Sequence, residues 1–281
     1  MRIRGGAGLG DSIYLRVIAE HFRSLGEDVI VCSDYPDVFI GADVKVEAFS
    51  RDRIDRLCHY TVGKTNPRTT QFQDMLDSAG IPVAVELRVD WKIRNDALVQ
   101  DLEARSDGRP IILVHGGRVP MGRKDNFGRE IMPDERGFKV ALGYLVKKYN
   151  AFLVRIGMGP DLYKLDGHIH YDLNDRTTVP DLFDLSMASD GIVAQCSFAV
   201  PLAEVFDTPL LAVCAHAGMA PGVHMFVRQI TPAKILQKPM TSRYFMDDWS
   251  SSAIESVVEK FQGTMGYSMS PHVGGLERFV K

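Results

Sequence analysis

Hydrophobic and polar residues alternate along this chain in two recurring patterns. Short, continuous apolar runs such as residues 29–32 and 111–115 are typical of strands buried on both faces of a parallel sheet. Between these runs, apolar residues recur at the three- and four-residue spacing of amphipathic helices, most clearly from Phe138 to Tyr149. The alternation of the two patterns predicts an α/β protein.

The first half of the chain is predicted to form one series of strands and helices. Expected strands cover residues 2–4, 29–32, 44–49, 57–62 and 83–89, and expected helices cover residues 11–25, 72–79 and 95–106. The tetrapeptide from Asp107 to Pro110 then interrupts the pattern. We therefore expect a domain boundary there, with an N-terminal domain over 1–107 and a C-terminal domain over 108–281.

A second series follows this boundary. Expected strands cover residues 111–115, 152–156, 191–195 and 210–214, and expected helices begin near Asp134 and cover 180–189, 198–206 and 249–261. Because each series has enough apolar residues for a core of its own, the sequence predicts two Rossmann-like domains that face a cleft.

Composition and charge exclude several classes of protein. The 281 residues carry 33 basic and 36 acidic side chains, a net charge of −3, whereas a general polyanion binder usually has a large basic excess. No apolar run approaches the ~18 residues of a membrane span, and the first residues lack the apolar segment of a secretory signal. We therefore expect a cytoplasmic protein without a membrane span.

The sequence shows no pattern typical of a metal site. The four cysteines are far apart and include no CxxC pair, which indicates reduced thiols and not a disulfide framework or a zinc site. His168 and His170 share one face of a possible strand, but no third ligand is evident nearby. We therefore expect neither a metal nor another bound cofactor.

A glycine-rich loop between the first strand and the first helix is a candidate site. Gly6 and Gly8 fit a dinucleotide fingerprint, and Asp34 follows the second strand as a ribose-binding carboxylate would, but Asp11 stands at the third glycine position. Alternatively, Asp11 accepts a proton from a substrate hydroxyl. In a third interpretation Asp11 and Ser12 cap the helix, a role that is compatible with catalysis.

The second half offers further candidates for binding phosphate. The long loop 116–133 follows the carboxyl end of a strand and carries Arg123 and Lys124, which would either neutralise a diphosphate or be solvated. Ser197 begins a turn and helix whose free N–H groups could hold phosphate, and Glu204, two turns further on, could reach a ribose.

Several segments together resemble glycosyltransferase family 9, the ADP-heptose:lipopolysaccharide heptosyltransferase-like proteins of GT-B fold. Leu9-Gly10-Asp11 after the first strand is similar to the LGD signature of that family. In the second half the resemblance follows the same order over residues 112–117 (a strand and an HPG-like turn), 132–138 (WPPERF-like), 153–160 (a strand and a glycine turn), 178–188 (a short helix) and 195–212 (NDSGPMHLA-like, then GTPVVAL-like).

The resemblance implies an inverting, metal-independent glycosyltransferase that uses a nucleotide-diphosphate sugar. Asp11 falls on the position of the family's general base. We expect the donor side to include Arg123, Lys124, Ser197, Glu204, Gly157 and Gly159, and the acceptor side to include Gly8, Gly10 and Ser12. The acceptor would be a saccharide or another hydroxyl compound, and the acidic charge balance gives no support to a modified DNA base.

The chain departs from the family at one turn. Cys196 stands where the family has aspartate, Pro201 where it has histidine, and Phe198 where it has glycine. The first two family residues help to bind the donor diphosphate, so these departures leave the donor open. Two other classes also stay open, namely an NAD(P)-binding oxidoreductase that uses the glycine loop and a catalytically silent binding protein that keeps the fold.

Overall fold

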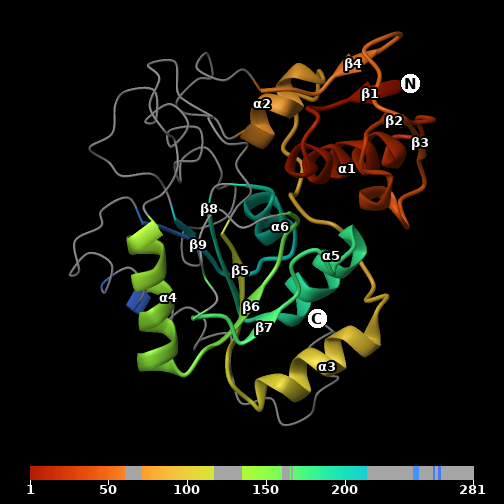
Figure 1. Ribbon diagram of the computed structural model, residues 1–281. Coiled ribbons are helices and arrows are strands. Elements are labelled where there is room, and N and C mark those ends of the chain that lie inside the picture. Colours follow the sequence, from red (N-terminus) through yellow and green to blue (C-terminus); the bar gives the residue numbers. More distant parts are fainter. Residues whose placement is uncertain are drawn as a thin grey trace.

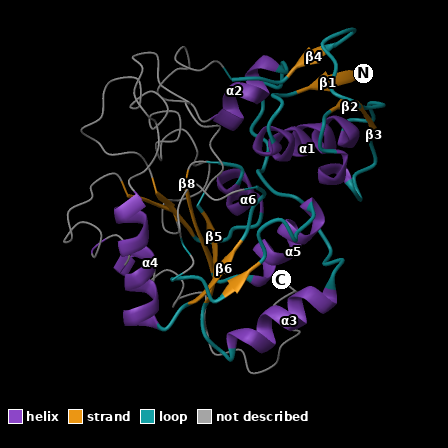
Figure 2. Cartoon of the chain, viewed as in Figure 1, coloured by secondary structure: helices purple, strands orange, loops and turns teal. Residues whose placement is uncertain are grey.

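The computed structural model describes residues 1–60, 71–116, 135–159, 165, 167–195, 197–213, 243–246, 256 and 259–260. These residues form two parallel β-sheets with helices packed on them (Figures 1 and 2). Strands before residue 58 build the first sheet, and strands after residue 110 build the second. The α/β class that the hydrophobic pattern predicts is confirmed.

The first unit holds a four-stranded sheet. Its elements are β1 (Arg2–Arg4), α1 (Leu9–Ser24), β2 (Ile30–Cys32), the 3-10 helix η1 (Pro36–Phe39), β3 (Lys45–Glu47), β4 (Arg56–Leu57) and α2 (Gln71–Ser78). The strand order is β3-β2-β1-β4. Central β1 pairs Ile3 with Val31 of β2 and with Arg56 of β4, so its carboxyl end opens directly into the glycine loop before α1.

The second unit holds a six-stranded sheet in the order β10-β9-β8-β5-β6-β7. Its elements are α3 (Asp96–Ser106), β5 (Ile111–His115), α4 (Glu135–Tyr149), β6 (Phe152–Arg155), β7 (Tyr171–Asp172), α5 (Val179–Ala188), β8 (Gly191–Gln195), α6 (Ala199–Val205), β9 (Leu210–Val213) and β10 (Arg243–Met246). All described pairs are parallel, so the loops after these strands gather at one edge of the sheet.

Helices cover both faces of this second sheet. Helix α4 lies on one face, where Phe138 and Leu142 pack with Ile112 of β5. Helices α5 and α6 lie on the other face, which Ile111 and Leu113 of β5 line (Figure 1). Successive residues of a strand point to opposite faces of the sheet, so Ile112 faces α4. The cluster on the α5 and α6 face continues without a break into the core of the first unit, so the two units pack directly against each other.

The segment that joins the two units is held by a buried carboxylate on α5. Asp184 is fully buried and accepts hydrogen bonds from the indole N–H of Trp91 at 2.7 Å and from the backbone N–H groups of Arg94 and Asn95 at 3.1 and 2.8 Å. The Trp91 ring also meets Phe183 edge-on at 4.8 Å between centroids. These contacts fix the joining segment to the second unit.

A buried arginine fixes the same segment to the first unit. Arg16 of α1 is 1% exposed, and its guanidinium donates to the carbonyl groups of Val38 at 2.7 Å, Ile40 at 3.1 Å and Asp90 at 3.3 Å. It also lies 5.4 Å from the centre of the Trp91 ring. The joining segment is thus bound on both sides, which restricts how the units can move relative to each other.

Most elements lie close to their predicted positions, with three differences. The expected strand over 83–89 is wrong, because this segment has no strand and instead buries Leu87 and Val89, with Val89 N–H bonded to the carbonyl of Val205 in α6 at 3.4 Å. Strands β7 and β10 were not predicted. Helix α1 begins at Leu9, two residues before the predicted start.

Two further predictions reach beyond the described residues. Of the strand predicted over 57–62, only Leu57 lies in a strand, β4; residues 58–60 are not in a strand, and residues 61–70 lie outside the described part. The late helix over 249–261 is described only at residues 256, 259 and 260, which are helical. The division of the chain at residue 107 stays a prediction; α3, just before it, packs against α5 of the second unit.

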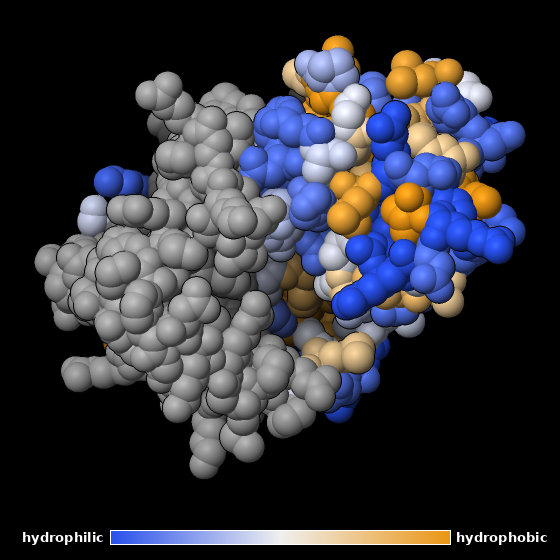
Figure 3. All heavy atoms as spheres, turned by 90° about the horizontal axis from the view of Figure 1, so that it is seen from above, coloured by the Kyte–Doolittle hydropathy of each residue, from blue (hydrophilic) through white to orange (hydrophobic). Residues whose placement is uncertain are grey.

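Hydrophilic side chains dominate the described part of the surface seen from above, with apolar ones scattered between them (Figure 3). The large apolar side chains that are exposed come from different elements, namely Leu25, Leu57, Val83, Val140 and Met158. Singly exposed apolar residues are normal on a folded protein, so this surface gives no sign of a docking patch.

Candidate active site

The glycine loop after β1 holds the carboxylate of Asp11 at its centre. Gly8 is the N-cap of α1, and Asp11 is the third residue of the helix. The Gly8 N–H donates to Oδ2 of Asp11 at 3.2 Å, which satisfies an amide that the helix leaves without a partner. The N-cap is therefore Gly8 and not Asp11 or Ser12 as predicted, and Asp11 accepts the N-cap N–H from the third position of the helix.

The Asp11 carboxylate lies against two glycines of the loop and leaves little room for a side chain at either position. A methyl group at Gly6 would clash with Asp11 and lie 2.6 Å from its Cγ, and one at Gly8 would lie 3.0 Å from Oδ2. Any larger side chain at Gly6 would therefore displace the carboxylate. The spacing that resembles a dinucleotide fingerprint here serves to hold an acidic side chain.

The surroundings of Asp11 make it a better base than an exposed aspartate. Burial raises the pKa of the Asp11 carboxyl, and hydrogen bonds from the Tyr60 hydroxyl and the Gly8 N–H lower it by less. The net direction is upward. Tyr60 follows β4, next to β1 in the sheet, and sequence analysis did not single it out.

Ser12, the next residue, faces away from the loop. It is 2% exposed, and its Oγ lies 2.9 Å from Oγ of Ser33, directly after β2. This bond joins α1 to the neighbouring strand. Contact of Ser12 with an acceptor stays a prediction, as do such contacts for Gly8 and Gly10.

Gly10 brings the loop into contact with the second unit. A methyl group at this position would lie 3.1 Å from Cγ of Pro201 and 3.3 Å from Cα of Phe198, both in or next to α6. The beginnings of α1 and α6 therefore meet at Gly10. Phe198 and Pro201 are two of the departures from the family 9 pattern, and in this chain both form the contact between units.

At the carboxyl edge of the second sheet, buried His115 and half-buried Ser197 form a hydrogen-bonded pair. His115 ends β5 and is 7% exposed, and Ser197 follows β8, the neighbouring strand. The Oγ of Ser197 lies 3.0 Å from Nδ1 of His115 and accepts the N–H of Ala199 at 3.3 Å. Sequence reasoning placed His115 at the end of a strand and in the HPG-like turn of the family resemblance, but gave it no role.

Gly157 and Gly159 lie on the other side of His115, in the turn after β6. A methyl group at Gly157 would lie 3.1 Å from Cδ2 of His115, and its φ of +139° also favours glycine. The N–H of Gly159 donates to Oδ1 of Asp175 at 2.6 Å, and its carbonyl accepts from Nδ2 of Asn174 at 2.8 Å. The turn is thus tied to the loop after β7.

The remaining candidates have different outcomes. Arg123, Lys124 and Cys196 lie outside the described residues. Glu204 is fully buried within α6, and its predicted contact with a ribose stays a prediction. The structure therefore brings Asp11 and the glycine loop near to Ser197 through the Gly10 contact, while the basic loop stays untested.

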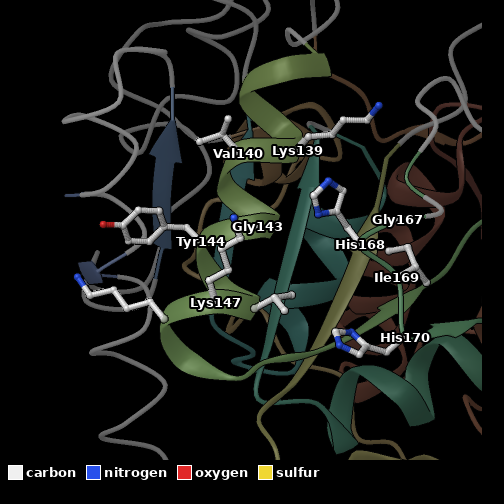
Figure 4. A pocket seen from close by; sticks show the side chains of 11 residues that line it. Lys139, Val140, Gly143, Tyr144, Lys147, Gly167, His168, Ile169 and His170 are labelled. Atoms are coloured by element: carbon white, nitrogen blue, oxygen red, sulfur yellow. The ribbon is translucent and has the colours of Figure 1, made fainter.

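The two histidines considered as metal ligands line a cavity of about 1340 Å³ beside α4 (Figure 4). Nδ1 of His170 accepts the backbone N–H of Leu153 at 3.1 Å, and His168 lies against Gly143. Within the described part of the chain, no three His, Cys, Asp or Glu side chains are placed to hold a metal ion. Cys32 and Cys58 are buried free thiols, and the reduced state of the four cysteines stays a prediction.

Among the comparisons with known proteins, only the comparison with solved structures finds matches, and these show the fold. No protein-family model and no curated protein matches the sequence. The structure is similar to a family 9 glycosyl transferase from Veillonella parvula, with a TM-score of 0.62 and 8% identity over 95% of this chain and 97% of that one. It is similar to the same degree to E. coli ADP-heptose LPS heptosyltransferase II, at 10% identity over 96% and 99% of the two chains.

The chain has the fold of family 9 glycosyltransferases. A third similar structure is the heptosyltransferase TibC in complex with ADP-D-β-D-heptose, with a TM-score of 0.59 and 12% identity over 96% of this chain and 76% of that one. The GT-B-like architecture predicted from the sequence is thereby confirmed. In the described part, no helix has the length and apolar character needed to cross a membrane.

Proposed function

We propose that this protein is a glycosyltransferase that moves a sugar from a nucleotide-diphosphate donor to an acceptor hydroxyl, with inversion and without a metal ion. The observation that carries the proposal is the position of Asp11. Its half-buried carboxylate lies against the glycine loop from the first turn of α1, and the neighbouring Gly10 touches α6 of the second unit, in a fold shared with heptosyltransferases. The acceptor is proposed to be a saccharide or another hydroxyl compound.

Asp11 would act as the general base. The acceptor hydroxyl would give its proton to the carboxylate while its oxygen attacks the anomeric carbon from the face opposite the leaving diphosphate. One Asp11 oxygen, Oδ2, is engaged by the Gly8 N–H, which fixes the orientation of the group. The raised pKa strengthens the base, and inversion follows from a single displacement.

The second unit would bind the leaving diphosphate. Arg123 and Lys124 are proposed to meet its negative charge on the strength of the resemblance, and Ser197 to donate from its hydroxyl. Cations and hydroxyl donors supply the stabilisation that a metal ion supplies in other transferases, so the proposal needs none. The turn at Gly157 and Gly159 borders this position next to His115.

An NAD(P)-binding oxidoreductase has less physical support. The Gly8 N–H, which a pyrophosphate would use, already donates to the Asp11 carboxylate, and that carboxylate would repel a pyrophosphate. A silent binding protein has one observation in its favour, since Phe198 and Pro201 pack on Gly10 where family members have glycine and histidine. Turnover separates it from the transferase.

The first experiment is a thermal-shift screen with ADP, UDP, GDP, CDP, NAD and NADP, each with and without magnesium. A ligand at 100 times its dissociation constant stabilises a protein by about 2.7 kcal/mol, enough to move the melting midpoint by several degrees. We expect one nucleoside diphosphate to raise the midpoint independently of magnesium. A rise with NAD or NADP alone would overturn the proposal.

The decisive variant is Asp11→Asn, compared with Asp34→Asn as the matched control. Asp34 is an exposed carboxylate after β2, on which the dinucleotide interpretation depends. We expect Asp11→Asn to keep nucleotide binding but to release nucleoside diphosphate from the nucleotide sugar about 100- to 10,000-fold more slowly, since a general base contributes that much. Equal rates in Asp11→Asn and wild type would reduce Asp11 to a helix cap, because asparagine caps nearly as well.

A further inference from the structure

His115 sits in a fitted pocket at the carboxyl edge of the second sheet. Its ring meets Phe198 edge-on at 4.7 Å between centroids, and its Cδ2–Nε2 edge faces Gly157, where even a methyl group would lie 3.1 Å from Cδ2. On the opposite edge, Nδ1 lies 3.0 Å from Oγ of Ser197. The ring orientation is therefore set by packing on two sides and by one hydrogen bond.

The hydrogen-bond partners of the ring decide where its proton lies. Burial lowers the pKa of the His115 imidazole to about 4, so the ring is neutral at neutral pH and carries a single N–H. Among the described residues, the only polar atom bonded to either ring nitrogen is Oγ of Ser197, at Nδ1. Among the described residues no acceptor is bonded to Nε2, whereas a proton on Nδ1 is donated to Ser197, and an unpaired donor costs more than an unused acceptor does.

The Nδ1–H form in turn determines what Ser197 can do. Its Oγ then accepts two hydrogen bonds, from His115 Nδ1–H at 3.0 Å and from the Ala199 N–H at 3.3 Å. Both lone pairs of the hydroxyl are used, and the O–H alone is left for a third partner. Ser197 is half-buried, so this O–H can reach a ligand at the sheet edge.

We propose that His115 is a positioning residue that holds Ser197 as a hydrogen-bond donor, and that this donor binds an anionic oxygen of the donor diphosphate. The inference rests on the proposed function, which supplies the diphosphate. It also predicts a selectivity of the site, because a hydroxyl that can only donate binds phosphate oxygens and disfavours ligand groups that present N–H or O–H.

The test measures binding of inorganic pyrophosphate, which carries the diphosphate oxygens of every such donor whatever its base. Calorimetry would compare wild type with Ser197→Ala, His115→Leu, His115→Asn and the double variant Ser197→Ala/His115→Leu. The amide of asparagine keeps an N–H near the Nδ1 position, whereas leucine keeps only the volume. His168→Leu removes a histidine from the α4 side of the same unit and is the matched control.

We expect Ser197→Ala and His115→Leu each to weaken pyrophosphate about tenfold, the loss of one hydrogen bond to a charged group. Because both variants remove the same interaction, the double variant should also lose about tenfold and not about a hundredfold. The pyrophosphate affinity of His115→Asn should stay within about threefold of wild type, and that of His168→Leu should equal wild type. Additive losses, or a His115→Asn as weak as His115→Leu, would overturn the inference.

A second measurement reads the tautomer directly in the wild-type protein. With ¹⁵N-labelled histidine, the ring nitrogens of His115 in the wild-type protein should show the Nδ1–H tautomer, assigned by the signal that His115→Asn lacks. The Nε2–H tautomer would contradict the inference. The two proposals can fail separately. If the variants change pyrophosphate affinity as expected but the protein transfers no sugar, only the proposed function is wrong. If the protein transfers sugar and Ser197→Ala binds pyrophosphate as tightly as wild type, only this inference is wrong.

Discussion

At the scale of single residues, Asp11 shows how a site can cost stability. A buried carboxylate loses hydration, and here that loss outweighs the hydrogen bonds from Tyr60 and Gly8, since the pKa of Asp11 is raised in the folded protein. A carboxyl group with a raised folded pKa stabilises the fold only while it is protonated. Its ionisation therefore makes folding less favourable as pH rises through that pKa.

We expect Asp11→Asn to melt at a higher temperature than wild type at pH 7, because asparagine occupies the same space without a buried charge. The difference should shrink as pH falls through the pKa of Asp11, where the wild-type group becomes neutral too. Differential scanning calorimetry between pH 4 and pH 8 measures this, with Asp34→Asn as an exposed control. A variant that melts lower than wild type at pH 7 would show that the carboxylate stabilises the fold.

At the scale of elements, the sequence predicted best those strands whose burial is specified by their own apolar residues. Strands β5 (Ile111–His115) and β8 (Gly191–Gln195) match their predicted ranges because a continuous apolar run is enough to specify a central parallel strand. The segment 83–89 is also rich in apolar residues, but it crosses between units and buries Leu87 and Val89 without a strand partner. Local pattern does not distinguish burial in a sheet from burial in an interface.

The joining segment yields a prediction about stability. Asp184 accepts three hydrogen bonds in a fully buried position, so Asp184→Asn leaves donors facing an amide N–H₂. We expect a loss of about 2–3 kcal/mol in the free energy of unfolding, measured by urea titration. The control Asp101→Asn changes a partly exposed carboxylate that pairs with Arg105 and accepts the Tyr171 hydroxyl, and it should destabilise the fold much less. Equal effects of the two variants would contradict this role for Asp184.

At the scale of the whole molecule, the contact at Gly10 sets how close the two units come. Gly10→Ala would place a methyl group 3.1 Å from Pro201 and 3.3 Å from the Phe198 backbone, so the units must separate by a few tenths of an ångström. We expect unchanged nucleotide affinity but about tenfold slower transfer, because a ~1 Å misplacement of a catalytic group costs on the order of 100-fold. Steady-state kinetics and calorimetry separate the two effects.

The control for this variant is Gly143→Ala in α4, where a methyl group would meet nothing closer than 3.7 Å. It should leave both transfer and affinity unchanged. A Gly10→Ala protein that transfers at the wild-type rate would mean that the distance between the units does not limit the reaction.

The candidate site was predictable only in part, because some of its contacts join segments that are far apart in the sequence. Asp11 and Ser197 could be found because each belongs to a local motif within one unit. The role of His115 needs the packing of the loops after β6 and β8 around one ring. The role of Phe198 needs a glycine from the other unit, 188 residues earlier in the chain, at position 10. Such convergence leaves no trace in spacing along the sequence.

The indole of Trp91 gives the protein a built-in optical reporter. Its N–H is bound to a carboxylate of one unit, and its ring lies beside the guanidinium groups of Arg16, from the other unit, and Arg94. Indole emission responds strongly to nearby charge, so a rotation between the units would change its colour and intensity. Since the chain has only two tryptophans, replacing Trp249 leaves a single tryptophan, in the joining segment. Any movement between the units can then be followed in real time without an added label.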